Sequence, residues 1–263
     1  MVFNNRTKTA KFERAVRMNH LINEIGAAFA CAERVRSGVS VLYSEQANAW
    51  FDAEDNGIAT NTRDCHERNL AHTRLIYREL RREGIDVDFS RACDLADNAL
   101  GARLLIVPTL AGLSEQEKEQ INAFAAHHTV AVFDAGSFGY RLWEQKGAAL
   151  LDTVGLLLKA DIRPQFTCTS PQLDVKMIAG EQDGHPFAIA CLINVDALER
   201  PIPAGTALSV NKAACGLPEG LIEAEWITPS ERLPLPVSQA AGCCLVTLPD
   251  ITTGGFIFFR KAP

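Results

Sequence analysis

Several features that would assign a chain to a function class are missing from this 263-residue sequence. Its longest apolar run is far shorter than the ~20 residues that a membrane-spanning helix needs. No run of Lys or Arg forms a basic stripe, and the net charge is −6. We therefore expect neither nucleic acid nor a membrane as a partner. The first twenty residues carry basic side chains without an apolar core, so the sequence indicates no secretory signal.

The eight cysteines also form none of the patterns that mark a redox or metal site. No pair has CxxC spacing, and none stands at a zinc-ligand spacing from a histidine. Most lie among apolar residues, where a reduced cysteine packs as a small hydrophobe. The sequence therefore predicts a cytoplasmic protein without a disulfide framework, a metal or a cofactor.

What the sequence does contain is a strand–helix–strand unit near its centre. Residues 104–107 form a continuous apolar run, which is typical of a strand buried on both faces. Ser114 and Glu117 have the spacing of a capping box at the start of a helix. Residues 129–133 form the next buried strand. Two parallel strands joined by a helix make a βαβ unit, around which the other elements can be placed.

Further strands are predicted at 39–43 and 85–89, and helices at about 62–83 and 140–158. Four βα repeats are half of what a closed eightfold barrel needs. The sequence therefore predicts an α/β domain over residues 38–160, built on an open, doubly wound parallel sheet.

After Lys159 the apolar spacing changes from helical to alternating. Gly and Pro punctuate this half at short intervals, and Asp183-Gly184 has the form of a hairpin turn. These patterns predict an antiparallel β-sandwich over residues 161–263. Its expected strands cover residues 173–177, 187–193, 207–210, 224–227, 243–248 and 255–259.

The first segment, residues 1–37, is predicted to hold a long helix over 9–35, with Gly38 as its stop signal. The apolar stripe of this helix has no evident partner in the following α/β domain, so it could contact another chain. Large aromatics in the polar loop at 44–61 could do the same, or could cover the sheet of their own domain. The interface candidates are Phe12, Ile22, Phe29, Trp50 and Phe51.

Ligands of open α/β sheets collect at the carboxyl ends of the strands. Ser137 lies there in a small-residue loop that resembles a nucleophile elbow. A serine nucleophile needs a base within reach, and the histidines at 127 and 128 are expected at the opposite end of the sheet. Helix capping is therefore the favoured interpretation, with a Ser137-dependent hydrolase or transferase as the alternative. The rim candidates are Ser44, Glu45, Thr109, Asp134 and Ser137.

A larger set of residues from both halves resembles one family. Together they are similar to the middle, trimerisation domain and the small C-terminal sandwich of the family-42 β-galactosidases. The resemblance implies a flavodoxin-like fold for the α/β domain, shared with class-I glutamine amidotransferases. The residues that carry it are 39–44, Trp50, 77–80, 84–89, 104–110, 113–114, 192–194 and 246–249.

The resemblance implies assembly in a carbohydrate context rather than catalysis. Those enzymes hold their two catalytic carboxylates on an N-terminal (β/α)8 barrel that this sequence lacks, so no Glu or Asp here receives either role. The amidotransferase-like relatives place a cysteine at the elbow, where this chain has Ser137. Our hypothesis is a non-catalytic scaffold portion that forms a trimer, alone or beside a separately encoded glycosidase barrel. A carbohydrate-binding module that uses Trp50 and the sandwich is a further alternative.

Overall fold

The computed structural model describes residues 10–49, 73–110, 112–133, 153–195, 200–217, 220, 222–240 and 242–262. The chain forms two compact units: one is Arg36–Pro164, and the other combines Met1–Val35 with Gln165–Pro263. The N-terminal segment, which the sequence sets apart as its own region, thus shares a unit with the β-rich half. None of the described helices is long and apolar enough to cross a membrane.

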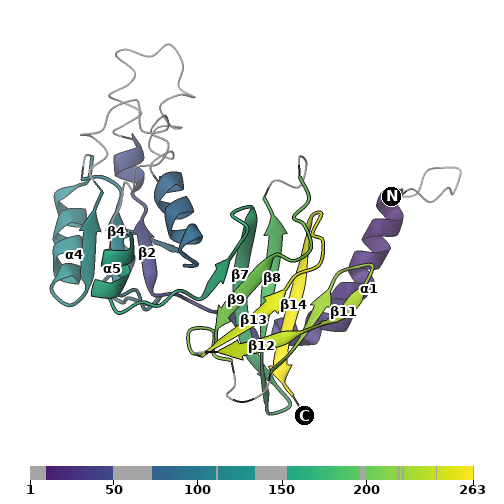
Figure 1. The fold of residues 1–263 in the computed structure, drawn as a ribbon. Coiled ribbons are helices and arrows are strands. Elements are labelled where there is room, and N and C mark those ends of the chain that lie inside the picture. The colour runs from purple at the N-terminus through teal and green to yellow at the C-terminus, as the bar shows by residue number, and fades with distance from the viewer. Residues whose placement is uncertain are drawn as a thin grey trace, which may run out of the picture. The chain divides into compact units, whose positions relative to one another are not determined.

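The unit Arg36–Pro164 is built on a parallel sheet with the strand order β3-β2-β4-β5 (Figure 1). Strand β4 coincides with the predicted apolar run, and all four of its residues are buried. The order reverses direction between β2 and β4, as a doubly wound sheet requires. The strands are β2 Val39–Leu42, β3 Asp88–Ser90, β4 Leu104–Val107 and β5 Thr129–Val132.

Helices cover both faces of this sheet, which confirms the predicted fold class. On one face, the helix at 73–82 and α5 (Thr153–Lys159) contribute Ile76, Leu80 and Leu157 to a buried cluster. On the other face, α4 (Glu115–Ala125) and the 3-10 turn η1 (Ala92–Asp94) pack over Leu105 and Val107. Because helices cover both faces of the sheet, its central strands are apolar and buried on both sides.

The strand predicted at 85–89 begins later, at Asp88. Gly84 has a left-handed backbone (φ +71°), and the Ile85 amide donates to the Leu80 carbonyl, so this stretch closes the preceding helix. The buried Asp86 carboxylate then accepts from Arg81 at 3.1 Å, a pair in which both side chains are at least nine-tenths buried. Residues 85–87 are therefore occupied with ending the helix rather than with strand pairing.

The other unit contains two antiparallel sheets, which confirms the predicted β-sandwich. The six-stranded sheet has the order β1-β7-β8-β14-β10-β11, and the four-stranded sheet has the order β12-β13-β9-β6. Side chains from both sheets, such as Met177 and Val246, form one buried core between them. The strands are β1 Ala32–Arg34, β6 Phe166–Cys168, β7 Leu173–Gln182, β8 His185–Asn194, β9 Ala207–Asn211, β10 Ile222–Ile227, β11 Arg232–Leu235, β12 Val237–Ala240, β13 Cys243–Thr247 and β14 Gly254–Lys261.

The N-terminal helix α1 (Ala10–Ala30) ends five residues before the predicted bound. The next residues form β1, which pairs antiparallel with β7, because edge pairing in the sheet outweighs the helical spacing that continues to Val35. The helix lies against the outer face of the six-stranded sheet (Figure 1), with Leu21, Ile25 and Ala28 buried there. The apolar stripe therefore has a partner inside the chain, in the β-rich half.

Gly38 does not end this helix, contrary to the sequence prediction. It lies just before β2 with φ +81°, a conformation that favours glycine. Its carbonyl accepts from the amides of Arg103 and Leu104, at 2.7 and 3.1 Å. The glycine thus serves the start of the β2–β4 pairing rather than the helix terminus.

Candidate functional site

The polar rim at the carboxyl ends of β2 and β4 is the candidate site of the α/β unit. The structure brings Ser44 and Thr109 to the same small hollow, at the point where the strand order reverses. The hollow has a volume of about 30 Å³, which accommodates little more than a water molecule. The described residues of its lining are uncharged and comprise Leu42, Tyr43, Ser44, Ala47, Asn48, Thr73, Pro108, Thr109 and Leu113.

Ser44 on this rim is tied into local structure. Its hydroxyl oxygen accepts from the Ala47 amide at 3.0 Å, at the start of a helical turn at 45–49. The Ser44 side chain also faces the Glu117 carboxyl and helps to lower its pKa. That carboxylate completes the predicted capping box of α4 by accepting from the amide and the hydroxyl of Ser114, at 2.9 and 3.0 Å. The Ser44 hydroxyl is therefore engaged in the local turn and lies near the capped start of α4.

The electrostatics of Glu117 agree with this structural role. Burial raises the pKa of its carboxyl, but the hydrogen bonds from Ser44 and Ser114 outweigh burial, and the pKa lies below its ordinary value. A carboxyl that must donate a proton near neutral pH needs the opposite shift. Glu117 is thus a hydrogen-bond acceptor that stays ionised.

The rim candidate Glu45 is exposed and adds only a charge near Arg91. The guanidinium of Arg91 instead makes a two-pronged contact with Asp94, with both N···O distances at 3.0 Å. The hydrogen bond from Arg91 lowers the pKa of the Asp94 carboxyl. This exposed pair stabilises the turn η1. The Asp94 carboxyl stays ionised and is not a candidate general acid.

The other rim candidates, Asp134 and Ser137, lie outside the described residues, as do Trp50 and Phe51. The two histidines expected far from Ser137 do lie before β5, at the amino end of that strand. His128 stacks on Phe124 with ring centroids 4.4 Å apart. Within the part of the chain that the structure describes, no three His, Cys, Asp or Glu side chains gather as metal ligands would.

The helix residues proposed as interface candidates differ in their surroundings. Phe29 packs edge-on against Phe256 of β14, with ring centroids 5.5 Å apart, so it contributes to a contact within the chain. Ile22 points away from the sheet and is 54% exposed. Phe12 is half-buried. Sequence spacing does not separate the inward from the outward positions, because the helix covers a sheet that is distant in sequence.

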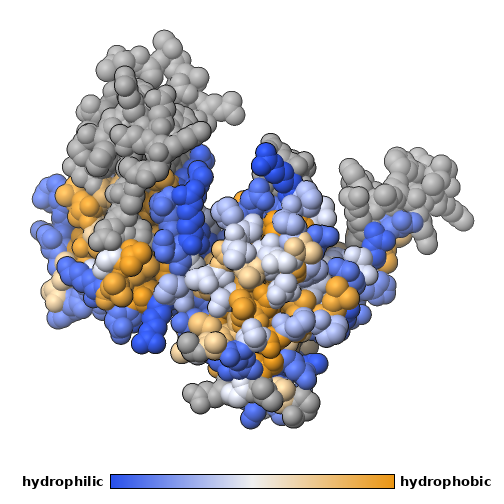
Figure 2. All heavy atoms as spheres, in the orientation of Figure 1, coloured by the Kyte–Doolittle hydropathy of each residue, from blue (hydrophilic) through white to orange (hydrophobic). Residues whose placement is uncertain are grey.

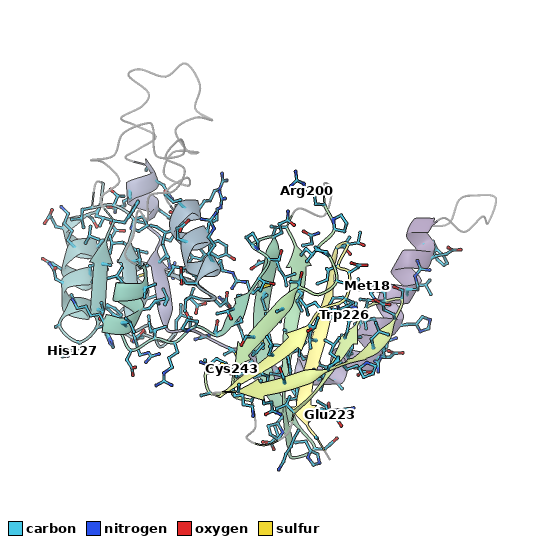
Figure 3. All side chains as sticks on the ribbon, in the orientation of Figure 1. Met18, His127, Arg200, Glu223, Trp226 and Cys243 are labelled. Carbon is cyan, nitrogen blue, oxygen red and sulfur yellow. The ribbon has the colours of Figure 1, made fainter. Side chains whose placement is uncertain are left out.

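The described tryptophan of the sandwich, Trp226, belongs to the core and is only 1% exposed (Figure 3). Its indole N–H donates to Glu231 at 3.1 Å. The ring packs so closely on Gly255 that an added Cβ there would lie 2.5 Å from it. Trp226 therefore cannot serve as a stacking platform for a sugar ring.

Comparison with known proteins yields a likeness of fold only. No protein-family model matches the chain, and no curated protein does. Among solved structures, α-L-fucosidase isoenzyme 2 from Paenibacillus thiaminolyticus matches with a TM-score of 0.57 at 11% identity. The match covers 98% of this chain and 53% of the fucosidase, so the chain spans about half of that protein's length.

Two further glycoside-active proteins give weaker matches. A rhamnosidase from Novosphingobium sp. PP1Y has a TM-score of 0.42 at 16% identity, over 67% of this chain and 20% of the rhamnosidase. An apo GH42 exo-carrageenase from Bacteroides ovatus has a TM-score of 0.49 at 10% identity, over 94% of this chain and 32% of the carrageenase. TM-scores below 0.5 are too low to establish a shared fold.

Proposed function

We propose that this chain is a non-catalytic scaffold portion of the glycoside hydrolase type, resembling the part of a family-42 β-galactosidase that follows the catalytic barrel. The observation that carries the proposal is the state of the rim at the switch point of the sheet. The Ser44 hydroxyl accepts from the backbone and lowers the pKa of the Glu117 carboxyl, and the hollow beside it has room for little more than a water. A fold similar to that of a fucosidase is thus combined with a described part of the rim in which Ser44 serves local structure.

The chemistry of glycoside hydrolysis supports the same conclusion for the described residues. A retaining enzyme needs two carboxyl groups about 5–5.5 Å apart, one of them with a raised pKa. The pKa values of the Asp94 and Glu117 carboxyls are lowered instead, because each carboxyl accepts hydrogen bonds that favour its ionised form.

The direct test is an activity assay on the purified full chain. We expect no hydrolysis of aryl β-galactosides or aryl α-L-fucosides above the buffer background. Turnover that disappears when one particular Asp–Glu pair is neutralised would contradict the proposal. Turnover that depends on Ser137 would instead favour the hydrolase alternative.

The scaffold role also entails self-association, and we propose a trimer on the basis of the family resemblance. Trp50 and Phe51 are the proposed contacts, since interface cores are rich in aromatic side chains. Sedimentation equilibrium should give a mass near three times the 28.7 kDa of one chain. Trp50→Ala or Phe51→Ala should lower that mass, whereas Ser137→Ala should not. A mass of 28.7 kDa at every concentration would contradict self-association.

A further inference from the structure

Three of the eight cysteines lie at one end of the four-stranded sheet. Cys243 and Cys244 begin β13, and Asn211 at the end of β9 is the register partner of Cys243. After β9 the chain turns back, so that the Cys215 amide donates to the Asn211 carbonyl at 3.0 Å. The turn therefore returns Cys215 to the strand end that pairs with Cys243.

Further bonds hold the turn at 211–217 against the start of β13. The Lys212 amide donates to the Gly242 carbonyl at 2.9 Å, and the Leu217 amide donates to the Lys212 carbonyl at 2.9 Å. Partners across antiparallel strands have Cα atoms about 5 Å apart, and a disulfide joins Cα atoms about 4.4–6.8 Å apart. Because Cys215 and Cys243 are both neighbours of Asn211, a small movement of the turn suffices to bring them into that range.

The two thiols differ in their access to solvent. Cys243 is half-buried on the outward side of the sheet, where its register partners Asn211 and Ala240 are uncharged. It is labelled in Figure 3, and in the same orientation the surface over β9, β13 and β12 is mostly pale and orange (Figure 2). Cys215 has no exposed surface. A dissolved oxidant can thus reach Cys243 first.

The environment of Cys215 keeps its thiol protonated in the reduced chain. Its Sγ donates to the Gln165 carbonyl at 3.4 Å. Burial, together with the nearby Cys243 and Cys244 thiols, raises the pKa of Cys215 from 9.0 to about 12. Only the thiolate attacks a disulfide, so Cys215 reacts slowly near neutral pH.

We propose that Cys243 and Cys215 form a redox-sensitive thiol pair, which low-molecular-weight disulfides such as oxidised glutathione convert into a protein disulfide. The Cys243 thiolate attacks one sulfur of oxidised glutathione, forms a mixed disulfide and releases one glutathione thiol. Cys215 then loses its proton to solvent, attacks the Cys243 sulfur and releases the second glutathione thiol. Two protein thiols are oxidised, and one glutathione disulfide is reduced to two thiols.

The crosslink closes a loop that contains β10, β11 and β12. The first two of these strands belong to the six-stranded sheet and the third to the four-stranded sheet, so the disulfide ties a connection between the two sheets. A crosslink restricts the unfolded chain, and the oxidised protein should therefore melt at a higher temperature than the reduced protein. The inference goes beyond the proposed function, because it involves neither the trimer contacts nor Ser137.

The test is peptide mass spectrometry on the folded full chain after incubation with oxidised glutathione. Free thiols are alkylated, and trypsin is applied without reduction. Trypsin separates residues 213–232, which contain Cys215, from residues 233–260, which contain Cys243 and Cys244. We expect the two peptides to become linked, and the reductant dithiothreitol to separate them again.

Variants assign the two steps to the two residues, with circular dichroism to verify folding. Cys215→Ala should stop the reaction at a glutathione adduct on Cys243, and Cys243→Ala should abolish the link. Cys191→Ala removes a buried thiol of the other sheet and is the matched control, which should link as the wild type does. In the wild type, conversion of the adduct to the link should accelerate about tenfold per pH unit between about pH 8 and 10, because Cys215 must lose its proton.

Three results would overturn the inference. One is an adduct on Cys243 that persists in the wild type without a link to residues 213–232, and another is a link that survives Cys243→Ala. The third is a link that forms only after the chain is unfolded in urea. A monomeric mass or glycosidase turnover would contradict the proposed function without affecting the thiol pair.

Discussion

The outer faces of the two sheets of the sandwich differ in what covers them. The six-stranded sheet presents Phe187 and Ile189, both buried, and α1 covers them with an apolar stripe from the same chain. The outward side of the four-stranded sheet, which includes Thr167, Ser209, Leu245 and Ser238 and is called the open face below, carries uncharged side chains, with Leu245 at 42% exposure. One outer face is therefore completed within the chain, whereas the other stays accessible.

The strands of the two sheets differ accordingly in the pattern of their apolar residues. In β8 the residues from Phe187 to Leu192 are apolar without interruption, because the strand is buried by the core on one side and by α1 on the other. In β13 buried and accessible residues alternate, which is the pattern of a strand with one buried face. A continuous apolar run in a strand of an antiparallel sandwich thus predicts that another element packs on the outer face of its sheet.

Truncating an inward side chain of α1 should weaken the packing of this helix on the six-stranded sheet. Leu21 is 3% exposed and packs with Ile25 and Ile227. Leu21→Ala should lower the free energy of unfolding by about 3 kcal/mol, since truncating a buried leucine loses burial and leaves a cavity. Urea unfolding measures the change. The neighbouring Ile22→Ala is the matched control and should cost less than about 0.5 kcal/mol; equal losses would show that the helix is not packed as described.

Thiol reactivity distinguishes the two faces without a mutation. Cys191 lies under α1, and burial raises the pKa of its thiol from 9.0 to about 11. The thiolate is the reactive form, so at pH 8 alkylation of Cys191 should be about a hundredfold slower than that of an ordinary thiol. Its rate should rise about tenfold per pH unit up to about 11. Peptide mass spectrometry after timed alkylation gives the rates.

The Leu21→Ala variant provides the control for this experiment. It should accelerate alkylation of Cys191 and leave Cys243, on the open face, unchanged. If Cys191 reacts as fast as Cys243 in the wild type, the cover does not protect the sheet.

A smaller effect is expected where α1 passes into β1. An added Cβ at Gly180 of β7 would lie 2.3 Å from the carbonyl oxygen of Cys31, so the strand and the helix end could not both keep their places. Gly180→Ala should cost about 1–3 kcal/mol of stability, as other overpacked sites do. Gly26→Ala, where nothing lies within 4 Å of the added carbon, should instead raise stability by up to about 1 kcal/mol through helix propensity. Thermal unfolding should give a lower melting temperature for Gly180→Ala and a higher one for Gly26→Ala than for the wild type.

The sequence predicts those elements whose residues interact locally. The run at 104–107 becomes β4, and the capping box of Ser114 and Glu117 forms as spaced. Strands β11 and β12 are not foreseen, although each pairs with a strand next to it in sequence, because Pro234 and Pro236 interrupt any alternation. The end of α1 is missed for a different reason, since β1 pairs with β7, which is distant in sequence, and Gly180 of β7 accommodates the turn into β1.

The candidate site is predictable only in part. Ser44 and Thr109 each follow a buried strand, so the rule for parallel sheets places both on one rim, and they do line one hollow. The influence of Ser44 on the pKa of Glu117 could not be foreseen, because the two residues come near each other only when α4 packs on the sheet. The open face is visible in the sequence only after register is known, since its residues come from four separate strands.

The most direct test of the contrast between the two outer faces is a paired charge insertion, measured by urea unfolding at low protein concentration. Ile189→Lys and Leu245→Lys each place an ammonium on the outward side of a strand, one under α1 and one on the open face. We expect Ile189→Lys to lower the free energy of unfolding by on the order of 4 kcal/mol, because it buries an unpaired charge. Leu245→Lys should change that free energy by less than about 0.5 kcal/mol. Similar losses from both substitutions, or a larger loss from Leu245→Lys, would contradict the account.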